Sequence, residues 1–331
     1  MTQFNDVPAE YKSYVNLLTY KRPSESDAAR DFGLKYLQPV MGDPDDFGNY
    51  YFTIQDTDGK IPKVMWTAHY DTVHRDEGRQ VVEVVGTKVQ LPSSSESSCL
   101  GADCTTGVWL ILEMIKAGVA GHYAIFADEE IGCLGSRAFV AGNANWLPYA
   151  IDAVISFDRM GTKDIITHQC DKKTASDGFA WSLAAILGTN HEPDPTGIYT
   201  DSNEFRSVVS ECTNIAVGYD RQHTKKETQD MAFLLRLRDK LIAADWSALH
   251  IERDCSITEW YTYDNTSYNS RTWGEGYVRQ KTSDRARLVE MMKEDPESVA
   301  DAMLEYGLDP SLVMDYLVDN SFEAWKRNYM Y

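Results

Sequence analysis

The sequence lacks the features that mark membrane, secreted and thiol-redox proteins. It has no apolar run near the ~18 residues that a membrane-spanning helix needs. Its opening stretch, MTQFNDVPAEYKSY, has neither the basic start nor the apolar segment of a signal peptide. Six cysteines occur, but no two form a CxxC pair. We therefore expect a cytoplasmic protein whose cysteines stay reduced and serve mostly as small buried residues.

The chain also lacks runs of Lys or Arg. Its formal net charge is −19, and an acidic surface repels nucleic-acid phosphates and anionic lipids. We therefore expect neither nucleic-acid nor membrane partners, and no oligomeric state is predicted. Part of the acidity lies late in the chain, in MMKEDPESVADAMLEYGLDPSLVMDYLVDN, where it chiefly favours solubility.

Segments of strand and helix character alternate over most of the chain. A hairpin is expected at 80–91, turning at Gly86 and Thr87. Strands are expected at 49–56, 63–69, 122–128, 151–158 and 214–220, and helices at 105–118, 177–188 and 228–250. This alternation predicts an α/β fold of three α/β/α layers around a mixed sheet that is parallel at its centre.

Three regions are expected in the 331 residues, of which 43% are hydrophobic. Residues 1–254 form the main domain, which is long enough for a sizeable core. Residues 255–280 are rich in Tyr, Trp, Asn and Ser and predict a linker or strap. Residues 281–331 predict a small helical appendage, because DPESVADAMLEYG and DPSLVMDYLVDN each open with a capping Asp and a first-turn Pro.

Histidine, aspartate and glutamate recur where the predicted strands end. In open α/β sheets, ligands bind beyond the carboxyl ends of the strands, so these side chains should meet at one edge. Each alone has an ordinary explanation: a surface histidine, a solvated Glu-Glu pair, or an Asp that caps a helix. Together they predict a metal site, because imidazoles and carboxylates without thiolates suit zinc, with cobalt or manganese as alternatives. The residues are His69, Asp71, Asp103, Glu129, Glu130, Asp158 and His223.

The motifs around these residues carry a resemblance to a known superfamily. HYDTV, GADCTTG, DEEIGCLGS, SFDRMG and YDRQHT occur in this order over roughly residues 50 to 250. The series resembles the co-catalytic di-zinc exopeptidases, which include single-domain bacterial aminopeptidases, tripeptidases, glutamate carboxypeptidases and aminoacylases. The resemblance implies their α/β fold and a hydrolase of peptide amide bonds that uses two Zn²⁺ ions per chain.

The resemblance also implies a role for each residue. His69 and Asp158 would complete one metal, Glu130 and His223 the other, and Asp103 would bridge both. Asp71 would orient His69 through its second ring nitrogen. Glu129 would be the general base for the attacking water.

One position departs from the family pattern. The superfamily usually has a second Asp after the bridging one, and here that position is Cys104. The second Asp is not a ligand in the family, so we expect the site to survive, although Cys104 as a metal ligand is an alternative.

The region around the expected ligands supplies candidates for binding substrate. Only residues 159–222 separate Asp158 from His223, which is too short for an inserted lid domain of ordinary size. Substrate contacts should therefore come from the same domain, with Arg159, Tyr219 and Arg221 as candidates.

Three functions fit the sequence. The leading interpretation is a zinc-dependent exopeptidase of the aminopeptidase type. An N-acyl amino acid deacylase or a carboxypeptidase would use the same metal site on another substrate. A non-catalytic binding protein on a retained hydrolase fold is the third, since a fold alone does not secure a function.

Overall fold

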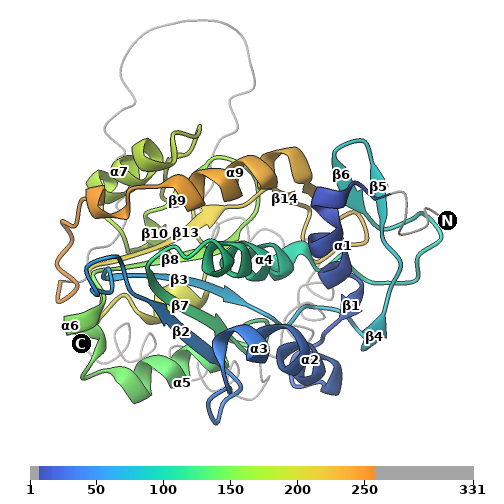
Figure 1. The fold of residues 1–331 in the computed structure, drawn as a ribbon, viewed down its shortest axis with the longest axis horizontal. Helices are drawn as coiled ribbons and strands as arrows, with labels where there is room; N and C mark the ends of the chain where they lie inside the picture. Colours follow the sequence, from blue (N-terminus) through green and yellow to red (C-terminus); the bar gives the residue numbers. More distant parts are fainter. Residues whose placement is uncertain (1–6, 258–331) are drawn as a thin grey trace, which may run out of the picture. The chain divides into compact units, whose positions relative to one another are not determined.

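The computed structural model describes residues 7–257, and within them a seven-stranded sheet lies between two layers of helices (Figure 1). The strand order is β12-β9-β13-β8-β3-β7-β2. The strands are β2 (Tyr50–Ile54), β3 (Val64–His69), β7 (Gly121–Phe126), β8 (Ala153–Arg159), β9 (Asp164–Ile166), β12 (Glu192–Asp194) and β13 (Glu211–Ala216).

The centre of this sheet is parallel and its margins are mixed. β13, β8, β3 and β7 pair in parallel, with His69 opposite Phe126 and Thr67 opposite Ser156. β2 pairs antiparallel to β7 at one edge, and β9 is antiparallel to β13 near the other. This arrangement confirms the predicted α/β fold with a mixed, centrally parallel sheet.

The central strands are buried on both faces, which explains why they read as continuous apolar runs. Side chains alternate between the two faces along each strand. Trp66 and Ala68 pack into the core beneath one helical layer, whereas Met65 packs into the opposite core. In β7, Tyr123 and Ile125 belong to the first core. The sheet therefore separates two hydrophobic cores, each closed by its own helices.

The helices divide between these cores. One layer contains α1 (Lys12–Leu18), α4 (Ala102–Lys116), α7 (Asp177–Leu187) and α9 (Met231–Ala243), and the other contains α5 (Leu134–Asn143), α6 (Leu147–Ala150) and α8 (Asp201–Glu204). Figure 1 shows α4 and α9 on one side of the sheet and α5 on the other. The remaining helical segments are α2 (Asp27–Phe32), α3 (Gln38–Met41), the short turns Ala9–Tyr11 and Trp246–Ala248, and a π-helical turn at Gly33–Leu37.

A second, smaller antiparallel sheet lies beside the first. Its order is β14-β15-β6-β5, formed by Tyr219–Asp220, Thr228–Asp230, Lys88–Gln90 and Glu83–Val85. The hairpin of β5 and β6 turns at Gly86 with a φ of 62°, as predicted. The turn between β14 and β15 carries His223. Two two-stranded pairs complete the fold: β1 (Tyr20–Lys21) with β4 (Gly78–Arg79), and β10 (His168–Gln169) with β11 (Lys172–Lys173).

Two predicted elements near the end of the domain have other bounds than expected. The helix expected at 228–250 begins only at Met231, because 228–230 pairs with β6 and β14 and the Asp230 side chain caps the Phe233 N–H at 3.1 Å. It ends at Ala243, before the separate turn at Trp246–Ala248. The strand expected at 214–220 is divided at Gly218, whose φ is 100°.

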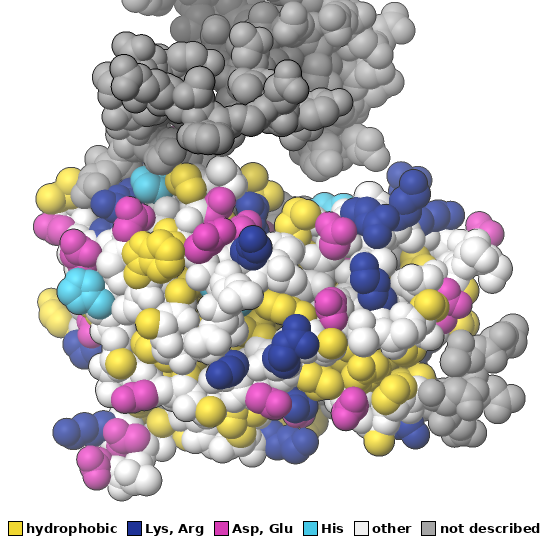
Figure 2. Space-filling model, turned by 90° about the horizontal axis from the view of Figure 1, so that it is seen from above, with side chains coloured by type: hydrophobic (Ala, Val, Ile, Leu, Met, Phe, Trp, Pro, Cys, Tyr) yellow, Lys and Arg dark blue, Asp and Glu magenta, His cyan; other side chains and the backbone are white. Residues whose placement is uncertain are grey.

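Four of the six cysteines are buried and one is partly buried, whereas Cys170 is exposed. This agrees with the expectation of mostly buried thiols. Acidic and basic side chains are intermingled on the face seen in Figure 2. No helix of the described residues has the length and apolarity to cross a membrane. The predicted strap beyond residue 257 and the predicted appendage at 281–331 lie outside the described residues.

Candidate functional site

The predicted site residues meet at the carboxyl edge of the central parallel strands. His69 is the last residue of β3, and Asp158 lies near the end of β8. Asp103 lies in the first turn of α4, and His223 lies in the turn after β14. Glu129 and Glu130 follow β7 in a turn. Segments far apart in sequence are thus brought to one end of the sheet, as expected for an α/β fold.

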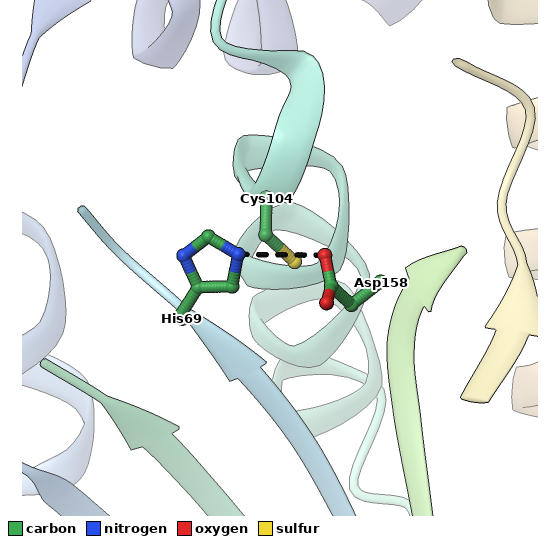
Figure 3. A group of neighbouring side chains, drawn as sticks. All are labelled: His69, Cys104 and Asp158. Carbon is green, nitrogen blue, oxygen red and sulfur yellow. Dashed lines mark ion pairs between the residues drawn. The ribbon is translucent and has the colours of Figure 1, made fainter. Parts of the chain in front are cut away.

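His69 is the centre of a first group of donors. Its Nε2 lies 3.2 Å from Asp103 Oδ1 and 3.4 Å from Asp158 Oδ1. Figure 3 shows His69 and Asp158 facing each other from neighbouring strands, joined by this ion pair. The His69 side chain is buried, with 1% of its surface exposed. The Thr200 hydroxyl donates to Asp158 Oδ2 at 2.7 Å, so the second oxygen of this carboxylate is also fixed.

His223 is the centre of a second group. Its Nε2 lies 3.2 Å from Asp103 Oδ2 and 3.3 Å from Glu130 Oε2. Asp103 therefore presents one oxygen to the His69 group and the other to the His223 group. This is the arrangement that a carboxylate shared between two cations requires, and both groups bring oxygen and nitrogen ligands together at short range.

Asp71 holds several parts of the site in place through hydrogen bonds. Its Oδ1 lies 3.2 Å from His69 Nδ1, so Nε2 of His69 is the nitrogen directed at Asp103. The same carboxylate accepts the backbone N–H groups of Glu129 and Glu130, both at 3.1 Å. The Ser24 hydroxyl donates to Asp71 Oδ2 at 2.7 Å. Asp71 thus fixes both an imidazole and the turn that carries the two glutamates.

The two glutamates lie in a turn after β7 and not in the strand itself. β7 ends at Phe126, and Asp128 has a φ of 56°, so the chain turns before Glu129. Glu129 Oε2 comes within 3.8 Å of His69 Nε2, while Glu130 joins His223. The backbone turn after β7 therefore directs Glu129 toward the His69 group and Glu130 toward the His223 group.

The site concentrates buried negative charge. Burial, with repulsion from Asp103, raises the pKa of Glu130 to about 7. Burial also raises the pKa of Glu129 well above its ordinary value, against the attraction of His69 and with repulsion from Asp158. For Asp103, burial is outweighed by hydrogen bonds from His223 and His69, so its pKa falls well below the usual range. Carboxylates this close to one another need a countercharge.

A divalent cation is the partner that this donor set fits. Glu130 Oε1 is buried and has no hydrogen-bond partner. An unpaired buried carboxylate oxygen is unfavourable, and a metal ion would satisfy it. The pKa of His223 is raised to about 11, because the carboxylates of Asp103 and Glu130 outweigh the effect of burial. A positive charge is therefore stabilised at both groups, and imidazole and carboxylate donors are ligands that zinc accepts.

Cys104 lies beside the first group and is shown with it in Figure 3. Its thiol is within ligand range of His69 and Asp158. However, Sγ donates a hydrogen bond to the Phe157 carbonyl at 3.1 Å. Burial, with repulsion from Asp158, raises the thiol pKa well above its ordinary value, which keeps Cys104 a neutral donor. These contacts favour Cys104 as a packing residue over Cys104 as a ligand.

The three candidates for substrate binding fall in different places. Tyr219 is buried at the site and donates to Asp158 Oδ1 at 3.2 Å. Arg159 lines the cavity beside the metal-ligand candidates, with its Nε 3.0 Å from Asp164 Oδ2. Arg221 is half exposed, pairs with Asp220 at 3.5 Å and is not among the residues that line the cavity. Arg221 is therefore not placed where it was expected.

A cavity of about 260 Å³ opens over the site. Acidic and imidazole groups line it together with apolar and aromatic residues. Its walls include Asp103, Glu129, Glu130, Asp158, Arg159, Met160, Ile166, Ile198, Tyr199, Thr200, Asn214, Tyr219 and His223.

Sequence reasoning missed three residues that support the site. Asn214 accepts the Asp158 N–H and donates to the Asp158 carbonyl, both at 2.9 Å. Glu227 accepts the Asp103 N–H at 3.0 Å. Asp201 is buried near the same carboxylates, and its Oδ1 has no hydrogen-bond partner. The three residues occur in TNIAV, HTKKET and TDSNEF, and their side-chain types can be read there. Nothing in these segments predicts that the side chains are buried at the site.

Asp201 leads to a prediction on pH and stability. Burial raises its pKa to about 8 from an ordinary 3.8, so the folded protein retains a proton that the unfolded chain releases. Asp201 therefore does not lower the free energy of unfolding below pH ~4, where both states are protonated. Above that pH the unfolded chain releases the proton, so the free energy of unfolding falls as the pH rises toward 8. We expect the metal-free protein to lose about 2 kcal/mol, or roughly 4–8 °C in Tm, between pH 6 and pH 8 relative to Asp201→Asn. Calorimetric scans in chelator test this, and an equal pH slope in both proteins contradicts it.

Comparison with known proteins places these observations in a family. The model of Peptidase family M28 matches residues 49–231, which contain every predicted ligand. No curated protein sequence matches the chain.

Solved structures share the fold at low sequence identity. A tripeptidase from Staphylococcus aureus is 13% identical with a TM-score of 0.58, covering 70% of this chain and 95% of its own. Aminopeptidase PepT from Bacillus cereus is 14% identical with a TM-score of 0.53, covering 71% and 97%. An aminopeptidase from Desulfurococcus kamchatkensis is 14% identical with a TM-score of 0.54, covering 71% and 94%. These structures confirm the zinc exopeptidase-like fold. Because the family model covers more than half of the sequence, the chain belongs to Peptidase family M28.

Proposed function

We propose that this member of Peptidase family M28 is an aminopeptidase that uses two Zn²⁺ ions. The observation that carries the proposal is the position of Asp103, whose two carboxylate oxygens each lie 3.2 Å from a different imidazole. His69 and Asp158 would hold one ion, and Glu130 and His223 the other. Two aminopeptidases and a tripeptidase with the same fold support the aminopeptidase activity.

Cations held by these residues would polarise a scissile carbonyl and lower the pKa of a nearby water molecule. Glu129 would accept the proton of that water on its carboxylate and return it to the departing amine. Burial raises its pKa well above the ordinary carboxylate value, which makes Glu129 a stronger base than a solvated glutamate. Asp71 keeps Glu129 in place through the backbone N–H and keeps His69 in the required tautomer.

The Tyr219 hydroxyl supplies a further neutral donor at the edge of the site. Burial, with repulsion from Asp103 and Asp158, raises its pKa well above the ordinary value, so the hydroxyl stays protonated. Besides its bond to Asp158, it lines the cavity where a substrate carbonyl would lie. This makes Tyr219 a candidate for contacting the substrate oxygen.

The charges around the cavity favour a free amine over a free carboxylate as the recognised end of the substrate. The acidic groups gathered there would attract a protonated α-amine. The guanidinium that lines the cavity, Arg159, is already paired with Asp164 at 3.0 Å. A carboxypeptidase or a deacylase needs a cation for the substrate carboxylate. The existing ion pair of Arg159 therefore favours the aminopeptidase among the three hypotheses.

The apolar residues that line the cavity favour an apolar side chain at the substrate N-terminus. Met160, Ile166 and Ile198 lie there, and Ile198 remains 69% exposed. Covering such surface with an aliphatic side chain is favourable by ~25 cal/mol per Å² of apolar area. A cavity of about 260 Å³ has room for one side chain of this kind.

A substrate panel tests the proposal. We expect anilides of Leu and Met to be hydrolysed with kcat/KM at least about 10-fold above those of Asp and Lys, since one or two buried methylenes change transition-state binding by roughly 1–3 kcal/mol. Activity should disappear in chelator and return with Zn²⁺.

The same panel separates the alternatives. Faster hydrolysis of N-acetyl amino acids would point to a deacylase, and faster release of a C-terminal residue would point to a carboxypeptidase. No hydrolysis and no metal uptake in calorimetry would leave only a binding protein on a hydrolase fold.

A further inference from the structure

Glu227 is a buried carboxylate that binds the chain around Asp103. Its Oε2 accepts the N–H groups of Leu100 and Gly101, at 2.9 and 2.8 Å, and its Oε1 accepts the N–H of Asp103 at 3.0 Å. The residue is 1% exposed. A buried carboxyl group that accepts three backbone N–H groups fixes those segments of chain firmly, because no water competes for the same donors.

The chain at Asp103 needs an acceptor from elsewhere. Gly101 precedes α4 with a φ of 75°, and the helix has no side-chain cap of its own. Asp103 and Cys104 have non-helical backbone angles, so the first turn is irregular. The N–H groups at the start of a helix lack intrahelical partners, and an anion there also interacts favourably with the helix dipole. Glu227 fills this role from 124 residues away.

The position of Glu227 in the chain ties this helix start to His223. Only three residues separate His223 from Glu227, and β15 begins at the next residue, Thr228. The β15 strand is held between β14 and β6. The turn carrying His223 is otherwise mostly exposed, and the His223 side chain itself is 41% exposed. Glu227 is therefore the buried attachment between the turn of His223 and the turn of Asp103.

We propose that Glu227 is a positioning residue for the metal held by Asp103, Glu130 and His223. The inference rests on the proposed metal site, which it extends. By fixing the Asp103 backbone and anchoring the His223 turn, Glu227 sets the separation of these two ligands. The positions of His69 and Asp158 depend less on Glu227, because both residues lie on central strands of the main sheet.

Glu227→Gln tests this role with little change in shape. A glutamine has one acceptor oxygen, so when it serves Leu100 and Gly101 its NH₂ group faces the N–H of Asp103. Loss of a partner behind a ligand typically lowers metal affinity roughly 10- to 100-fold. We expect this loss for one of two Zn²⁺ binding steps in calorimetry of the metal-free protein, with a change below ~3-fold for the other step.

Glu211→Gln is the matched control. Glu211 is also fully buried and also accepts three backbone N–H groups, from Ser176, Glu252 and Arg253, at 2.7–2.9 Å. It begins β13, at the end of the parallel strands opposite the site. A general loss of stability would affect both variants alike in thermal unfolding of the metal-free protein. Only Glu227→Gln should also weaken metal binding.

Two results would overturn the inference: unchanged Zn²⁺ binding in Glu227→Gln, or an equal loss in Glu211→Gln. If Glu227→Gln does not fold, Glu227→Asp is measured by the same criteria, since its shorter side chain keeps the charge but cannot reach both turns. The wild-type protein keeps the two proposals distinct. If it binds two Zn²⁺ and cleaves anilides, the proposed function stands whatever the Glu227 variants show.

Discussion

Glu129→Gln is expected to lower kcat/KM by about 10³-fold while leaving two metals bound. Proton transfer by a positioned side chain contributes roughly 10²–10⁴-fold to rate, and glutamine cannot accept the proton. The substitution preserves shape, and the backbone of residue 129 stays held by Asp71 at 3.1 Å. The amide also removes one charge from a crowded acidic site, so the fold should tolerate it. Steady-state rates with a Leu anilide and metal analysis of the same sample provide the measurement.

Glu130→Gln is the control for this effect. The two glutamates are adjacent, their side chains are only 13% and 7% exposed, and Asp71 accepts the N–H of each. Glu130, however, lies 3.3 Å from His223 and has a buried oxygen without a partner, so its loss should reduce metal content. A Glu129→Gln enzyme with full activity and full metal content would show that Glu129 is not the base.

Asp103→Asn is expected to abolish activity by removing the metals themselves. An asparagine offers one oxygen and one NH₂ group, so it cannot serve both the His69 side and the His223 side. Metal ions supply several kcal/mol of transition-state stabilisation, which corresponds to about 10³-fold or more in rate. We expect at most one Zn²⁺ per chain after dialysis, with residual activity near the detection limit. Metal analysis and rates over a range of added Zn²⁺ measure both effects.

Asp158→Asn provides the comparison for Asp103→Asn. Asp158 contacts the His69 group, and its other oxygen is bound by Thr200. Its replacement should weaken one metal and spare the one near His223. Two tightly bound metals in Asp103→Asn would contradict the shared role of Asp103, and far-UV circular dichroism shows that each variant is folded.

The chemistry of the site was largely predictable from the sequence. His69, Asp103, Glu130, Asp158 and His223 could be selected because each follows or enters a recognisable element, and parallel strands end at a common edge. The strands themselves were visible as short apolar runs, since the central strands are buried on both faces. The structure brings all five side chains into two groups that share Asp103.

The sequence-based predictions fail where a segment's local pattern favours one structure and its tertiary contacts impose another. The segment 228–230 has the composition of a helix start, yet it pairs with β6 and β14. Arg221 follows a predicted strand next to the site, but a φ of 56° and its pairing with Asp220 place it outside the cavity. Local propensity could not anticipate that residues 228–230 pair with β6, which lies more than a hundred residues earlier in the chain.

By itself, the sequence determined the fold class and the types and order of the candidate ligands, because periodicity and strand ends are local properties of the chain. Only the tertiary structure decided how those ligands are held. Glu227 reaches the start of α4 across 124 residues, and Ser24 reaches Asp71 across 47. Acidic residues such as Glu227 and Asp201 are usually solvated, so nothing in their neighbours along the chain indicates burial. Whether such a carboxylate faces water or backbone N–H groups depends on contacts that form only when distant segments pack together.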